Sequence, residues 1–111
     1  MATITRAFRV TSKKDVLAFA KDIDAWPAEA KAKFRSMFGN GHERWYYQKI
    51  GGEPYVISVA EFERAEGWDE FAKSDDEFVK WFRKRVKGLT GVSLKKAPKG
   101  PPSELVYDLN P

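Results

Sequence analysis

The sequence contains few side chains that could carry out chemistry. It has no cysteine and one histidine, His42, which excludes disulfides, thiolate metal sites, a cysteine nucleophile and any site that needs two imidazoles. His42 has a reference pKa close to neutrality and is therefore the candidate general base or proton relay. The simpler interpretation is a polar residue at the rim, where a Gly-rich loop enters a strand.

Arg6 is the second candidate, because it places a cation on the apolar side of a predicted strand. Ile4, Phe8 and Val10 alternate with polar or small residues at the two-residue period of a strand, and Arg6 falls in the apolar series. An unpaired buried guanidinium is costly. If this strand is central in its sheet, Arg6 should face a carboxylate such as Glu61, an anionic ligand or a dimer partner. An exposed place at the strand end is the remaining alternative.

Two runs rich in β-forming residues, 42–50 and 53–62, flank the pair Gly51-Gly52 and predict a hairpin. A two-residue turn fixes the register, so that Ile50 lies opposite Glu53, and His42 lies opposite Glu61. In the same register Tyr46 lies opposite Ile57.

The hairpin has two faces, and neither is purely polar. We assign one face to the helices because it contains the small residues Ser58 and Ala60, together with Trp45, Tyr47, Val56 and Phe62. The other face mixes large apolar groups with polar ones, which is typical of an interface or a ligand cavity. The candidate substrate-binding residues on this open face are Arg44, Tyr46, Tyr55 and Glu61. Trp45 could also stack on a planar ligand, but packing is the simpler role for all these aromatic residues.

The rest of the chain predicts the elements that must position these residues. With eight Phe, four Tyr and four Trp in 111 residues, it can bury one core, and we expect a single domain over 1–111. The expected elements outside the hairpin are a strand over 3–10, a helix over 13–24 capped by Ser12, a kink or second helix from Pro27 to Gly39-Asn40-Gly41, a short helix around Trp68 and Phe71, a helix over 75–88 opened by Ser74 and Glu77, a basic linker over 95–102 and a strand over 103–109. Together with the hairpin, this order of elements predicts an α+β fold, a ferredoxin-like four-stranded antiparallel sheet with helices on one face.

Two stretches of the sequence carry a resemblance. EFERAEGWDEFAKSDDEFVKWFRKRVKGLTG and the closing PPSELVYDLNP resemble the dimeric α+β barrel superfamily, in particular its antibiotic-biosynthesis-monooxygenase-like branch. The resemblance implies a homodimer that packs its open sheet faces together. If the protein is catalytic, it also implies a cofactor-independent oxidation or rearrangement in which His42 is the base and Arg6 or Arg44 holds the anion. Haem is not expected, because His42 is not in a predicted helix. The break at Pro27 and the segment 92–102 depart from the family pattern.

The charge distribution and the hydropathy limit the kinds of partner that we expect. Residues 53–77 carry nine acids and two bases, whereas 78–102 carry eight bases and no acid. The bases of 83–87 lie in the last turns of a predicted helix whose first turn carries acids. The helix dipole favours this arrangement by itself, so the basic stretch does not require nucleic acid as a partner. No apolar run suits a membrane span and no secretory signal is apparent, so a cytoplasmic location is expected.

The functional expectation is a protein that binds a hydrophobic or aromatic small molecule, without a cofactor or metal. Whether it is an enzyme stays open. The alternative is a non-catalytic dimeric binding or stress-related module.

Overall fold

The structure of the protein is a computed structural model that describes residues 2–95 and 102–110. These residues form three strands and four helices. Their bounds are β1 (Ala2–Arg9), α1 (Lys13–Asp24), α2 (Ala28–Met37), β2 (His42–Ile50), β3 (Glu53–Phe62), α3 (Gly67–Lys73) and α4 (Glu77–Thr90).

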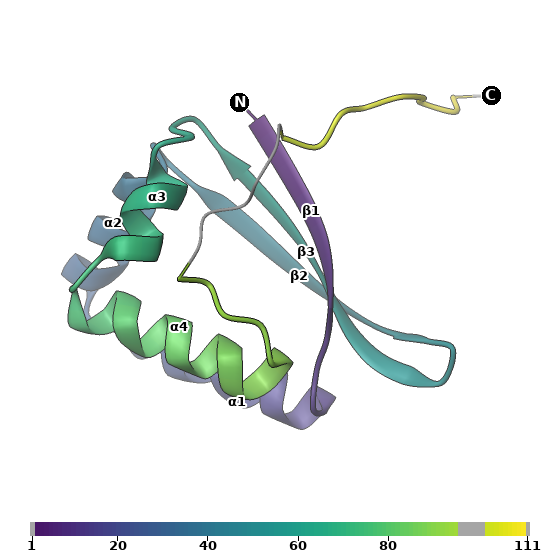
Figure 1. The fold of residues 1–111 in the computed structure, drawn as a ribbon, viewed down its shortest axis with the longest axis horizontal. Coiled ribbons are helices and arrows are strands. Elements are labelled where there is room, and N and C mark those ends of the chain that lie inside the picture. The colour runs from purple at the N-terminus through teal and green to yellow at the C-terminus, as the bar shows by residue number, and fades with distance from the viewer. Residues whose placement is uncertain (1, 96–101, 111) are drawn as a thin grey trace.

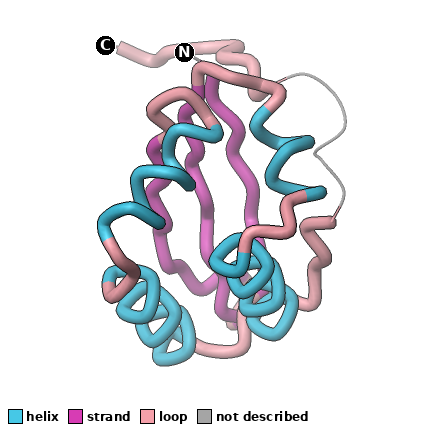
Figure 2. The backbone as a smooth tube through the Cα atoms, turned by 90° about the vertical axis from the view of Figure 1, so that its left-hand side faces the viewer, coloured by secondary structure: helices cyan, strands magenta, loops and turns pink. Residues whose placement is uncertain are grey.

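The strands form one antiparallel sheet in the order β1-β3-β2, and the helices lie on one face of it (Figures 1 and 2). The register of the β2–β3 hairpin is the predicted one, with Ile50 opposite Glu53 and His42 opposite Glu61. The two-residue turn at Gly51-Gly52 has positive φ at both glycines, which suits the twist of the strands. The helices cover the face of Trp45 and Val56, as the small residues of β3 predicted.

The prediction of a four-stranded ferredoxin-like sheet is wrong, because the described residues form three strands. The expected strand over 103–109 is not formed, and residues 102–110 have no regular secondary structure. The backbone N–H of Ser103 donates to the carbonyl of Thr3 over 2.7 Å, and its hydroxyl accepts from the backbone N–H of Thr5. Beyond Ser103 the chain passes the N-terminal end of β1 and runs away from the sheet, so it has no described strand beside it to pair with (Figure 1). Residues 96–101 of the predicted basic linker lie outside the described residues.

Side-chain caps fix where α1 and α4 begin. The Ser12 hydroxyl accepts from the backbone N–H of Asp15, as predicted. Ser74 is not the cap of α4, because Asp76 accepts from the backbone N–H groups of Phe78 and Val79 and α4 begins two residues later than predicted. Hydrogen bonding from Lys33, and then from the helix N–H groups, lowers the pKa of the Asp76 carboxyl, so this capping acceptor stays charged.

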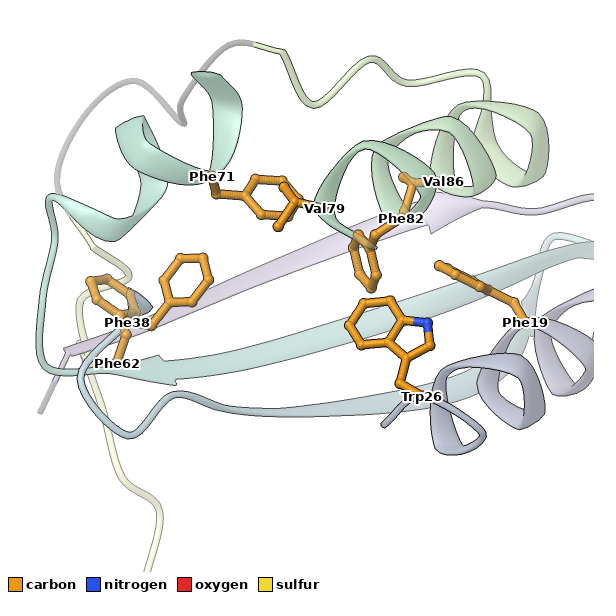
Figure 3. Close-up of a cluster of buried hydrophobic side chains, with 8 residues drawn as sticks. All are labelled: Phe19, Trp26, Phe38, Phe62, Phe71, Val79, Phe82 and Val86. Carbon is orange, nitrogen blue, oxygen red and sulfur yellow. The ribbon is translucent and has the colours of Figure 1, made fainter. Parts of the chain in front are cut away.

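The hydrophobic core divides into two clusters. The larger one is built mainly by helices, and the strands contribute only Phe62 to its buried members. Figure 3 shows Phe19, Trp26 and Phe82 directed toward one another between α1 and α4. The smaller cluster joins Val10, Val16 and Val56. The helices therefore pack largely on each other, and the middle of the sheet face lies between the two clusters.

No helix in the described part of the chain has the length and apolar character needed to cross a membrane.

Candidate ligand site

A cavity of about 280 Å³ lies between the helices and the inner face of the sheet, meaning the face that the helices cover. All three strands and all four helices contribute to its wall. The wall is mostly apolar, and its aromatic members are Phe8, Phe19, Phe34, Phe38, Trp45, Phe62, Trp68, Phe71 and Phe82. Leu94, from the segment after α4, also borders it.

Polar side chains enter this wall from the middle of the sheet. Arg6 on β1 pairs in register with Ser58 on β3, which pairs with Trp45 on β2. Strand alternation places all three on the inner face, and Glu43 lies two residues before Trp45 on that same face. Arg6, Ser58 and Glu43 thus form a polar strip across an otherwise apolar wall.

The Glu43 carboxylate is held by two neighbours. It accepts a hydrogen bond from the indole N–H of Trp45 and another from the Ser58 hydroxyl, the latter over 3.0 Å. Both bonds use the same oxygen, Oε1. These contacts fix the orientation of Trp45 at the cavity wall and give the small buried Ser58 a partner for its donor.

Arg6 differs from the sequence prediction in two ways. Its strand is at an edge of the described sheet rather than in the centre. It does not pair with Glu61 either, because Thr3 is the register partner of Glu61 and Arg6 therefore lies on the opposite face of the sheet from it. Glu61 pairs instead with Arg44, over 3.3 Å.

The other predicted site residues lie together on the outer sheet face, which no helix in the described part of the chain covers (Figure 2). His42, Arg44 and Tyr46 alternate along β2, and their neighbours on β3 include Tyr55 and Glu61. The structure thus separates Arg6 from the five residues with which it was grouped. It also separates Trp45 from the two tyrosines, so the three cannot stack on one planar ligand. His42 and Glu61 border the cavity at its Gly41 end, and the His42 imidazole has no hydrogen bond to any described residue.

Arginines of the basic stretch 83–87 are engaged within the fold. Arg83 donates to the backbone carbonyls of Phe71 and Ser74, which connects α4 to the end of α3. Arg85 pairs with Asp22 over 2.7 Å, and its guanidinium lies 4.9 Å from the centre of the Trp81 ring. These contacts give both arginines a structural role.

The sequence interpretation missed Glu43 and the cavity itself. A signal for Glu43 was present, because its parity in the hairpin puts an acid on the face assigned to the helices. The cavity had no such signal, since its volume depends on how far the helices stand from the sheet. Among the residues that the structure describes, no group of three or more His, Asp or Glu side chains could hold a metal ion.

The chain matches no family model, no curated protein and no solved structure in comparisons with known proteins. The inner cavity and the outer sheet face are therefore the basis for assigning a function.

Proposed function

We propose that the protein binds an apolar small molecule in the cavity between its helices and its sheet. The observation that carries this proposal is the volume of about 280 Å³ within a largely apolar wall. An apolar cavity of about 150 Å³ is large enough to take up benzene. The cavity here has nearly twice that volume and could hold a ligand of up to three rings, and its many aromatic side chains favour such a ligand.

Binding has more support than catalysis. The monooxygenase-like reaction that the resemblance implies stays a prediction, with His42 as base and Arg6 as anion holder. His42 is exposed at the first residue of β2 and its side chain belongs to the outer face, whereas Arg6 lines the cavity. A reaction inside the cavity would require His42 to act from the Gly41 end, across the edge of the wall.

A cavity-filling variant tests the binding proposal. Ala60 is a buried residue of β3 in the cavity wall, and Ala60→Leu would occupy part of the space. We expect the wild type to enhance the fluorescence of the neutral probe N-phenylnaphthylamine, and Ala60→Leu to weaken the affinity for this probe by about tenfold or more. Val59→Leu makes a similar change on the outer face and should leave the titration unchanged.

Thermal melting checks that each variant is folded. If Ala60→Leu does not fold, Ile4→Phe fills the same cavity from β1. A folded filling variant that binds the probe as well as the wild type would contradict the proposal, as would a wild type that does not bind it.

A second candidate role is association of two copies through the outer sheet face. Tyr46 and Ile50 are 54% and 44% exposed there, and Ile57, which is the register partner of Tyr46, and Val59 lie on the same face of β3. The same face carries Arg44 and Glu61. A two-fold axis that passes between these two residues would bring Arg44 of one copy near Glu61 of the other, so that part of the face would be self-complementary in sign.

The mass of the protein in solution tests this role. We expect a dimer for the wild type and a shift toward monomer for Tyr46→Lys, because loss of a central aromatic contact at an interface costs about 2 kcal/mol or more. Leu17→Lys is the matched control, since Leu17 is a similarly exposed hydrophobic residue on α1. Light scattering after size exclusion gives the masses. A monomeric wild type, or equal effects of both substitutions, would contradict the role.

A further inference from the structure

We propose that the ligand of the inner cavity carries a single anionic headgroup, such as a carboxylate, on its apolar body, and that the Arg6 guanidinium binds this group. The inference rests on the proposed function and specifies its ligand class. It follows from the state of the charged side chains in the cavity wall, which are Arg6, Arg35, Glu43 and Glu61, with His42 beside them.

The two acids in the wall already have partners. Glu43 accepts from Trp45 and Ser58, and Glu61 pairs with Arg44. The two arginines do not, because no described residue gives Arg6 or Arg35 an ion pair or a side-chain hydrogen bond. The positive charge in this wall is therefore the charge that is free to receive a ligand.

Arg6 is the better placed of the two arginines. It is half-buried on the inner face of β1 between Ile4 and Phe8, whereas Arg35 is exposed in the last turn of α2. Other arginines on the sheet have carboxylate partners, Arg9 with Glu53 over 2.7 Å and Arg44 with Glu61. Arg6 is thus a cation in an apolar wall, and its five N–H donors meet no acceptor among the described residues.

A carboxylate is the group that fits this position. It can accept two parallel hydrogen bonds from a guanidinium, and such charge-assisted pairs are stronger where water is largely excluded. The remaining wall is apolar and suits a hydrocarbon or aromatic body. The ligand class is therefore an amphiphile with one charge, because the rest of the wall offers little to a highly charged molecule.

Competition between two ligands of equal chain length tests the headgroup. Octanoate and octanol differ at the head alone, and each is used to displace N-phenylnaphthylamine at neutral pH. We expect octanoate to displace the probe at a concentration roughly tenfold lower than octanol, as one charge-assisted hydrogen-bonded pair predicts. Arg6→Gln should remove this preference and leave displacement by octanol unchanged.

Two variants serve as controls. Arg9→Gln removes a charge from the outer face of the same strand and should retain the preference. Arg6→Lys keeps the positive charge and should restore part of the preference, which a merely structural role of Arg6 would not predict.

The outcomes separate this inference from the proposal on which it rests. If the wild type does not bind the probe, both are overturned. If it binds the probe but octanoate and octanol compete equally, or if Arg6→Gln weakens both ligands alike, the cavity binds a neutral ligand and the headgroup inference is overturned.

Discussion

Replacing Phe19 with alanine should lower the free energy of unfolding by about 3–5 kcal/mol, the usual cost of removing a buried phenylalanine side chain. Phe19 is 2% exposed and its ring lies 5.3 Å from that of Trp45 and 5.2 Å from that of Phe82. It therefore joins the helices to the sheet, and it also lines the cavity. Its loss would leave a void that the surrounding rings cannot fill without moving.

Urea unfolding followed by circular dichroism measures this effect. Leu17→Ala is the control, because Leu17 is on the same helix but is 59% exposed, and its truncation should change stability by less than about 0.5 kcal/mol. Equal effects of the two substitutions would show that Phe19 does not join the two layers. If Phe19→Ala does not fold, Phe19→Leu provides a smaller loss in the same direction.

The hairpin is the part of the fold that the sequence predicts best. Gly51-Gly52 limits the turn to two residues, and a two-residue turn determines every pair from Ile50 and Glu53 back to His42 and Glu61. The small residues Ser58 and Ala60 then indicate which face the helices cover. All of this information is local, so a single sequence is enough to read it.

The relation between β1 and the hairpin is not local, and the sequence left several alternatives open for Arg6. Glu61 was one of its expected partners, but the long-range register puts Thr3 opposite Glu61. A shift of one residue moves a side chain to the other face, and no short turn fixes the register of β1. The pairing of Arg44 with Glu61 was accessible from the hairpin alone, because both residues are on its outer face.

The prediction of a strand at 103–109 was wrong for a related reason. Leu105, Tyr107 and Leu109 lie at every second position, as they would in a strand. This pattern is a property of the segment alone and does not show whether another strand lies beside it. A strand also needs an adjacent edge, and β1 offers Ser103 contacts only near its own N-terminal end, at Thr3 and Thr5. The candidate site was likewise divided between two faces because its members came from strands whose relative register the sequence does not determine.

Two glycine-to-alanine substitutions should change stability in opposite directions, although the chemical change is the same. Gly67, at the start of α3, is buried against the end of α2. An added Cβ would lie 2.8 Å from the Phe38 ring and would overlap the backbone carbonyl oxygen of Met37. Gly88 is inside α4 and an added Cβ there meets no atom within 4 Å.

We therefore expect Gly67→Ala to destabilise the protein by about 1–3 kcal/mol, the cost of overpacking, because the obstacle is backbone and cannot rotate away. Gly88→Ala should stabilise it by about 0.5–1 kcal/mol, since alanine favours a helix interior over glycine. Thermal melting of the two variants beside the wild type gives the signs directly. A destabilised Gly88→Ala would show that α4 does not have free space at this position, and an unchanged Gly67→Ala would show that α2 and α3 are not in close contact. Because α3 carries Trp68 and Phe71 of the cavity wall, Gly67→Ala should also weaken binding of N-phenylnaphthylamine, whereas Gly88→Ala should leave it unchanged.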